Sequence, residues 1–518
     1  MLARIDHRLN TLQLHRLVRA VLQGRMPDEQ RARMEHGAHI LLAGGGKPGD
    51  PSDSEQWLRY QALASHLTAS NALTCEDDWA RDLVINLVKF YFYWGDYASG
   101  RDLAQRVVDE WRNILGPDHR QTLQTAKLLG YYWWVEGDFD AAKAIQADTL
   151  HRYQCTVGPD DEGTIDAMGM VASTLRISGQ FAEARDLDLE AFRRSRRGIG
   201  ENDPATLRAA HNLGVSLRLT GEFRTARQLD ADTYRRRVAV LGDDDPETLR
   251  TLNNFTIDER ECGEYLKSRR LVERIYGQYV SVFGVGHQET IRIARNLAVA
   301  RRRAGDHENA FKLAEDTMNR FRDRFGATHP DAIAAALNFA VDIRETDDLA
   351  RAQTLAAQTA EWYRATLGAQ HPFTLYARTN LGIVLRLLGR PREAQEHNRT
   401  AWSTLDRLLG SNHVLTLTCG INLASDLSAL GDHQRAYELD TEMLNRSRDV
   451  IGAEHPSTLA CGLNLSFDLA ALGRAEESAA LFDRTLAVYI RVLGDDHRAI
   501  SAARDGARAN CDVDPMQF

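Results

Sequence analysis

Asparagine and arginine side chains recur in this sequence at intervals of 42 residues, and they are its clearest candidates for chemistry. An arginine stands six residues after the asparagine position in six successive intervals. The asparagines are Asn86, Asn212, Asn254, Asn296, Asn338, Asn380, Asn422 and Asn464, and the arginines are Arg176, Arg218, Arg260, Arg302, Arg344 and Arg386. More arginines share the stripe, four residues before the asparagine at Arg208, Arg250 and Arg292, and beside it at Arg295.

These residue types suit the binding of a peptide. An amide side chain both donates and accepts hydrogen bonds, so asparagine can pair with the peptide group of any residue. Arginine pairs bidentately with carboxylates. On a helix that turns about 100° per residue, the asparagine and arginine positions lie within one third of the circumference. The stripe therefore predicts a surface for an extended peptide that carries acidic groups or a free carboxyl terminus.

A structural role is the alternative for the same residues. The asparagines can instead satisfy backbone carbonyl groups of a neighbouring repeat, because buried polar groups need partners. The arginines can pair with acids of the chain itself, such as Asp258 or Asp342. Toward the carboxyl end Ser428 and Ala470 take the arginine position while Asp468 appears nearby, so the basic stretch ends there.

The 42-residue interval is marked by glycines at the ends of predicted helices. A glycine recurs at every 42nd residue from Gly116 to Gly494, and a second column from Gly95 to Gly473 is interrupted only by Asp347. A capping residue followed by proline, as in Asp203-Pro204, is typical of a helix start. Glycine supplies the left-handed residue that closes a helix. Apolar residues at three- and four-residue spacing lie between these signals, so each unit is predicted to be a helix, a tight turn and a helix.

The repeated pattern NLG…L…GEF…A resembles the tetratricopeptide repeat, and the LGxxHPxTL connection resembles its kinesin-light-chain subtype. This resemblance implies an all-α, right-handed α-solenoid of about ten helical hairpins over residues 79–494. A small cap of helices and a β-hairpin is expected over residues 1–78, and a capping helix with a tail over residues 495–518. In related proteins the asparagines of the concave surface grip the backbone of an extended peptide.

Two segments resemble parts of a bacterial system. The segment LARIDHRLNTLQLHRLVRAVLQ resembles the region that follows the nucleotide-binding and winged-helix modules in signalling ATPases of the NB-ARC (STAND) class. The ending NCDVDPMQF, with the whole layout, resembles the tetratricopeptide component of FxSxx-COOH peptide-modification systems. The resemblance implies that an ATPase module precedes this chain in a longer protein, although the sequence contains no P-loop.

Residues that commonly carry catalysis or bind cofactors do not form a recognised motif here. Gly44–Lys47 lacks the earlier glycine of a P-loop, and Pro48 stands where the metal-binding Ser or Thr is needed. A histidine column suits helix capping and contains His119, His287, His329, His371, His413, His455 and His497. Successive positions lie about 10 Å apart, which is too far for two of these histidines to bind one metal ion. His36 and His39 share a helix face without an evident third ligand, which favours surface residues. We predict no enzyme activity, no cofactor and no metal.

Composition narrows the classes of partner. The 518 residues carry a formal net charge of −9, which offers no electrostatic footprint for nucleic acid. No apolar run is long enough for a membrane helix. The six cysteines are scattered without a CxxC pair, as is typical of reduced thiols in a cytoplasmic protein. The expected partner is a protein or extended peptide, with no nucleic acid and no membrane, and the oligomeric state stays open.

Three functions remain open from the sequence. The preferred one is a protein- or peptide-binding scaffold or sensor arm, with a concave groove lined by asparagine and arginine, in a bacterial signalling or peptide-modification system. The second is an autoinhibitory regulatory region of a STAND ATPase. The third is an enzyme, which would lose activity on a single polar substitution, whereas a ladder of binding residues loses affinity gradually.

Overall fold

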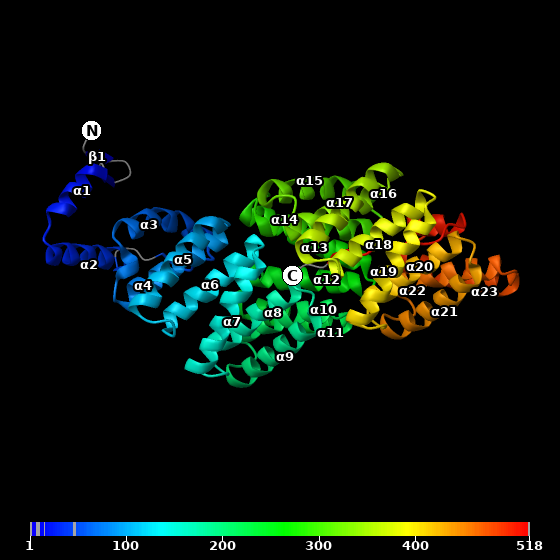
Figure 1. Cartoon of the computed structure of the whole chain (residues 1–518), viewed down its shortest axis with the longest axis horizontal. Helices are drawn as coiled ribbons and strands as arrows, with labels where there is room; N and C mark the ends of the chain where they lie inside the picture. The colour runs from blue at the N-terminus through cyan, green and yellow to red at the C-terminus, as the bar shows by residue number, and fades with distance from the viewer. Residues whose placement is uncertain (1–2, 7–10, 15, 45–47, 516–518) are drawn as a thin grey trace. The chain divides into compact units, whose positions relative to one another are not determined.

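The computed structural model describes residues 3–6, 11–14, 16–44 and 48–515 (Figure 1). The chain divides into two units, residues 1–135 and 136–518. Gly44 is the last residue of a helix, and the rest of the predicted connector Gly44–Lys47 lies outside the described residues. Within the described residues, no helix combines the length and the apolar character needed to cross a bilayer.

The first unit opens with two short antiparallel strands, β1 (Ala3–Asp6) and β2 (Thr11–Leu14). Its helical elements are α1 (Arg16–Arg25), α2 (Asp28–Gly44), η1 (Ser54–Gln56), α3 (Trp57–Ala69), η2 (Ala72–Thr74), α4 (Asp78–Trp94), α5 (Tyr97–Ile114) and α6 (Arg120–Glu136), which ends at the division. The predicted hairpin and helices before the repeats are thereby confirmed. The domain boundary predicted at residue 78 stays a prediction.

The second unit is a continuous succession of helical hairpins. Its helices are α7 (Phe139–Thr156), α8 (Glu162–Ile177), α9 (Phe181–Gly198), α10 (Pro204–Leu219), α11 (Phe223–Leu241), α12 (Pro246–Glu261), α13 (Tyr265–Phe283), α14 (Gln288–Arg303), α15 (His307–Phe325), α16 (Pro330–Arg344), α17 (Leu349–Leu367), α18 (Pro372–Leu387), α19 (Pro391–Leu409), α20 (Val414–Ala429), α21 (His433–Val450), α22 (Pro456–Ala471), α23 (Ala475–Leu493) and α24 (Arg498–Arg504). Each helix from α7 to α22 packs on the next (Figure 1). The predicted all-α solenoid is confirmed.

Capping side chains and left-handed residues define the hairpins, as the sequence predicts. The Asp203 carboxylate accepts a hydrogen bond from the amide of Ala205, and the His329 ring accepts one from the amide of Asp331. Because the cap bonds to a free amide of the first turn, it stabilises the helix start. Asp347 replaces glycine in its column and still adopts the left-handed conformation, with φ of 64°.

Contacts between residues 194 positions apart join distant hairpins of the second unit. The Nε2–H groups of His371, His413 and His455 donate to the backbone carbonyls of Ile177, Leu219 and Glu261, at 3.0, 2.9 and 3.1 Å. Each donor is the cap of a first helix, and each acceptor lies at the carboxyl end of an earlier first helix. Burial lowers the pKa of each of these histidines to about 4. These three histidines therefore cap helices and also join hairpins that are distant in the sequence.

Candidate functional site

The repeated asparagines and arginines of the second unit lie on the first helices of its hairpins, α8 to α22. We call the surface that they form the ladder face. Asn212 is half-buried, whereas Asn254, Asn296, Asn338, Asn380 and Asn422 are buried, as are Arg176, Arg218, Arg260, Arg302 and Arg344. The buried side chains are therefore shielded from bulk solvent, and their partners decide what they do.

Two asparagines nearer the amino end, Asn254 and Asn296, bond to other side chains of the first helices. The amide nitrogen of Asn254 lies 3.3 Å from Nδ1 of His211. The amide oxygen of Asn296 accepts from Arg260 at 2.6 Å, and its nitrogen donates to Asn253 at 2.8 Å. These two asparagines therefore bond to side chains of the solenoid, and their role in peptide binding stays a prediction.

Several arginines pair with acids of the solenoid itself. Arg208 contacts Asp166 at 3.2 Å, Arg250 contacts Glu247 at 2.9 Å, and Arg292 and Arg295 contact Asp331 at 2.8 and 3.0 Å. These ion pairs agree with the structural alternative, and a role for these four arginines in peptide binding stays a prediction.

The arginine ladder has a repeated contact geometry. An arginine can reach one acid on the second helix of its own hairpin and another on the first helix of the next hairpin. Arg218 contacts both, Asp230 at 3.2 Å and Asp258 at 2.6 Å. Arg176 contacts the acid of its own hairpin, Asp188, at 2.6 Å. Burial raises the pKa of Asp188 to about 6, although Arg176 acts to lower it.

The last described segment of the chain, residues 507–515, lies along the carboxyl half of the ladder face, and we call it the tail. Its backbone is held at every second residue by one asparagine. The amide of Ala509 donates to the Asn464 oxygen at 2.8 Å, and the Asn464 nitrogen donates to the Ala509 carbonyl at 3.1 Å. Asn422 makes the same pair of bonds to Cys511, at 3.3 and 2.8 Å.

Asn380 completes the series with Val513, at 3.1 and 2.9 Å. The tail therefore runs back along the array, from α22 through α20 to α18, and advances two residues for each repeat. The side chains of Cys511 and Val513 are buried among apolar residues of the hairpins. In this half of the ladder face the asparagines bind an extended peptide segment, and that segment belongs to the same chain.

The alternate tail residues meet the arginine ladder, since successive side chains of an extended chain point to opposite sides. Asn510 accepts from Arg386 at 2.7 Å, and Asp512 accepts from Arg344 at 2.6 Å. Asp514 pairs with Arg302 and with Arg303, the latter at 2.6 Å. Burial would raise the pKa of Asp514, but the two arginines outweigh it and hold that pKa below its ordinary value.

The remaining alternate residue, Arg508, occupies a position that the ladder leaves open. It contacts Asp440 and Asp468, both at 2.5 Å, and the Asn464 carbonyl at 3.2 Å. Ser428 replaces the ladder arginine in that repeat. Asp440 and Asp468 lie at the same sequence spacing from Ser428 as the two acid partners of Arg218 lie from Arg218. The guanidinium of Arg508 thus makes the contacts that an arginine at position 428 would make.

Sequence reasoning missed the tail as the occupant of the ladder face, and with it Arg508, Asp512 and Asp514. It also missed Cys75, which lies close to His36 and His39 and is a third potential ligand. His39 is buried, so the prediction that it is a surface residue is wrong. The sequence did contain one signal for the tail. The charged residues of the tail alternate, and Ser428 interrupts the arginine ladder in a repeat that keeps its acids.

Family models match the repeats of the second unit. Two family models, each described as tetratricopeptide repeat, match residues 163–237, 249–323 and 331–402 and residues 416–457 and 458–499. Together they match more than half of the chain, which therefore belongs to the tetratricopeptide repeat family. No curated protein matches the sequence.

Solved structures resemble parts of the chain. A Rap protein complexed with competence and sporulation factor has a TM-score of 0.52 at 12% identity, and the match covers 71% of this chain and 98% of that one. The putative kinesin light chain repeats of Podosopora anserina have a TM-score of 0.32 at 24% identity, covering 40% of this chain and 97% of that one. BtubC (BKLC) of P. vanneervenii has a TM-score of 0.33 at 17% identity, covering 50% and 97%. The Rap structure supports the assignment of the fold.

Proposed function

We propose that the ladder face binds an extended peptide segment of a partner protein, so that the chain is a scaffold or sensor arm and not an enzyme. The supporting observation is that Asn380, Asn422 and Asn464 each bond to both the N–H and the C=O of one tail residue. These bonds use only backbone groups, so they would hold any peptide in this register, whatever its side chains.

The spacing of the repeats suits an extended ligand. Two residues of an extended chain span about 6.6 to 6.8 Å, from a rise of 3.3 to 3.4 Å per residue. Packed helices lie about 8 to 10 Å apart between their axes. On the inner side of a curved stack the surface spacing is shorter than the axial spacing, so one asparagine per repeat can match every second peptide group. The two-residue register of the tail follows from this match.

An acidic ligand fits the charges on this half of the ladder face. Arg302, Arg303 and Arg344 receive the carboxylates of Asp512 and Asp514. The prediction of a ligand with acidic groups is therefore retained in the proposal. A free carboxyl terminus is retained as an alternative anion, and the terminus of this chain lies outside the described residues.

A binding experiment on the full chain tests the proposal. The substitutions Ala509→Pro, Cys511→Pro and Val513→Pro remove the three tail amides that the asparagines accept from, which frees the ladder face; we call this variant the tail-proline chain. A fluorescent synthetic peptide with the sequence of residues 505–515 is expected to bind it saturably, as measured by anisotropy. Binding to the unaltered chain is expected to be weaker, because a tethered tail competes at an effective concentration in the mM range.

Matched controls make the experiment specific. A peptide with proline at the same three positions must not bind, since it lacks the same amides. Asn422→Ala in the tail-proline chain must weaken binding of the unaltered peptide, whereas Asn254→Ala must not, because Asn254 bonds to His211 away from the tail. Equal binding of both peptides, or no binding of either, would refute the proposal.

The cellular setting belongs to the same proposal. The resemblance of the first segment to NB-ARC ATPases and of the ending to FxSxx-COOH systems supports a bacterial, cytoplasmic signalling or peptide-modification role. Regulation of a STAND ATPase by these repeats is the second candidate function, supported by the same first segment. Co-expression with a candidate ATPase separates the two, since ATP hydrolysis must rise on removal of the repeats only under the second.

A further inference from the structure

The ladder face lacks two sets of charges at defined repeats, and the tail supplies both. Resting on the proposed function, we infer that this surface selects peptides with a basic residue followed, four and six residues later, by carboxylates. The tail carries this pattern as Arg508, Asp512 and Asp514. It is the occupant that an external peptide of the same pattern must displace.

The basic position is created by acids without a cation of their own. Asp440 and Asp468 are fully buried, and Ser428 stands where the ladder arginine that would pair with them is expected. One repeat earlier, Arg386 fills the equivalent position and bonds to Asp426. Two buried carboxylates without a cation are costly, so this position requires a cation from elsewhere. Burial raises the pKa of Asp440 well above its ordinary value, and Arg508 acts to lower it.

The acidic positions arise where a ladder arginine lacks an acid partner on the solenoid. Ala356 and Val384 stand at the two positions where the acid partners of Arg344 would lie. Neither side chain can pair with a guanidinium. Arg344 is nevertheless buried, and its partners are Asp512 of the tail and the adjacent Glu345. Arg302 has an alanine in place of the acid on the second helix of its own hairpin, and its other acid partner, Asp342, lies 3.1 Å away. Arg344, which lacks both of these acids, and Arg302, which lacks one of the two, therefore accept the acids of the tail.

The register links these positions. Because the tail advances two residues per repeat, the basic position at Ser428 and the acidic positions at Arg344 and Arg302 must be filled by residues i, i+4 and i+6 of one extended segment. The position between them, at Arg386, takes the neutral oxygen of Asn510 at 2.7 Å, and Arg386 also contacts Asp426. The pattern is thus a property of the solenoid, and the tail shows one sequence that satisfies it.

Peptide competition on the tail-proline chain tests the selectivity. The peptide of residues 505–515 is compared with versions that carry Arg508→Ala or both Asp512→Asn and Asp514→Asn. We expect each change to weaken binding by at least about 100-fold, the factor for loss of one partner of a buried charge pair. Equal binding of all three peptides would overturn the inference while leaving the proposed function intact, whereas no binding of any peptide would overturn both.

A substitution on the solenoid gives the reciprocal test. Ser428→Arg restores the ladder arginine beside Asp440 and Asp468, as Arg386 stands in the preceding repeat. The preference for Arg508 over alanine in the peptide must then disappear. In the chain with an unaltered tail, the same substitution must speed hydrogen exchange in residues 507–515, and this second measurement does not depend on the proline variant. An unchanged preference together with unchanged exchange would overturn the assignment of the basic position.

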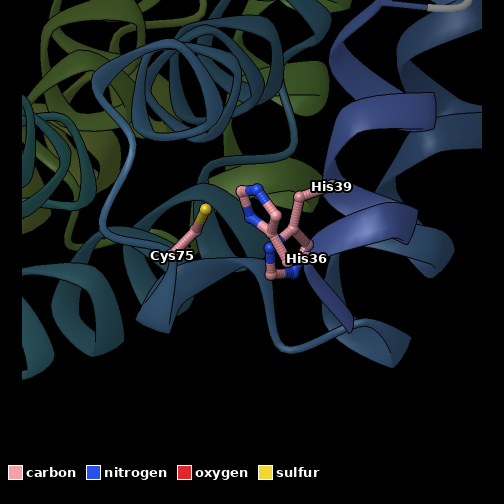
Figure 2. Close-up of side chains that lie close together, drawn as sticks. All are labelled: His36, His39 and Cys75. Carbon is pink, nitrogen blue, oxygen red and sulfur yellow. The ribbon is translucent and has the colours of Figure 1, made fainter. Parts of the chain in front are cut away.

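A separate observation in the first unit points to a metal. One nitrogen each of His36 and His39 and the sulfur of Cys75 lie within 4.8 Å of one another, and Figure 2 shows the three side chains gathered between α2 and the loop before α4. We propose that they bind a divalent transition metal, with zinc the best match to a set of imidazole and thiolate ligands. Zinc bonds of about 2.0 to 2.3 Å require only a modest approach of these atoms.

The hydrogen bonds of His39 support the metal assignment. Its Nε2–H donates to the Ser70 carbonyl at 2.8 Å, so the other nitrogen, Nδ1, carries a lone pair. That Nδ1 is buried and has no hydrogen-bond partner among the residues that the structure describes. A ligand histidine commonly donates its second N–H to a carbonyl, which fixes the tautomer and the ring orientation. The side chain of His36 is 52% exposed, and the Asp77 carboxylate lies 3.7 Å from its Nδ1, so a water or Asp77 can complete the coordination.

Metal titration of the full chain tests this site. After removal of metal with a chelator, the chain is expected to bind one zinc ion, and cobalt is expected to give a sulfur-to-cobalt charge-transfer band. Cys75→Ser must abolish the band, and His36→Ala, at a side chain that is 52% exposed, must weaken zinc binding more than the roughly 10- to 100-fold typical of an outer partner. Cys155→Ser, at an exposed cysteine, is the control. An unchanged affinity in the His36 variant, or no binding by the unaltered chain, would overturn the site.

Discussion

Removing the guanidinium of Arg508 is the sharpest perturbation of the tail that the structure offers. Arg508→Ala takes away the contacts of 2.5 Å to Asp440 and to Asp468, which have no exposed surface, and the bond of 3.2 Å to the Asn464 carbonyl. Breaking a buried ion pair from one side costs about 3 to 5 kcal/mol, because the other charge stays buried. At about 1.4 kcal/mol for each factor of ten, docking of the tail should weaken by roughly 100- to 5,000-fold.

Hydrogen exchange followed by mass spectrometry on residues 505–515 measures this change directly. Exchange in the tail should accelerate by the same factor, up to the rate of an unbound peptide. Arg504→Ala is the matched control, because Arg504 pairs with Asp495 on the surface and both side chains are about half exposed or more. Such a pair contributes about 0 to 1 kcal/mol. If the tail exchanges at the same rate in the Arg508 variant and in the unaltered chain, the cation position at Ser428 is not what holds it.

Two predictions concern the solenoid itself. Gly214→Ala should lower the melting temperature, because the added Cβ would lie 2.5 Å from the Asp230 carboxylate and overpacking costs about 1 to 3 kcal/mol, whereas Gly277→Ala, with open space around it, should raise it. His413 should make the fold less stable as the pH falls from 6.5 toward 4, because burial lowers its folded-state pKa to about 4 and the unfolded chain takes up the proton first. His413→Asn keeps a capping side chain, so its stability relative to the unaltered chain should improve by about 2 kcal/mol between pH 7 and pH 5, as chemical denaturation at both pH values can show. The comparison of variants is needed because Asp188, whose pKa burial raises to about 6, acts in the opposite direction.

The repeat could be predicted from the sequence because its signals are local. The glycine columns, the caps and the apolar spacing each act within one hairpin, and they recur without an insertion. Even Asp347, the exception in its column, adopts the left-handed conformation that the column predicts. The placement of the asparagine and arginine stripe on the first helices follows from the same register.

The occupant of the ladder face could not be predicted in the same way, because it depends on contacts between distant parts of the chain. Val513 meets Asn380, 133 residues earlier, and His371 meets Ile177, 194 residues earlier. Such contacts depend on the curvature of the stack, which no single repeat encodes. The division of the asparagines into those bound to side chains, such as Asn296, and those bound to the tail also emerges only from that curvature.

Residue-resolved hydrogen exchange of the unaltered chain tests the central claim most directly. The account predicts an alternating pattern in the tail, with the amides of Ala509, Cys511 and Val513 protected and those of Asn510 and Asp512 exchanging faster. The triple substitution of Asn380, Asn422 and Asn464 by alanine should abolish the pattern while the helices stay protected. Exchange of all five tail amides at the rate of a free peptide in the unaltered chain would contradict peptide binding by the ladder face.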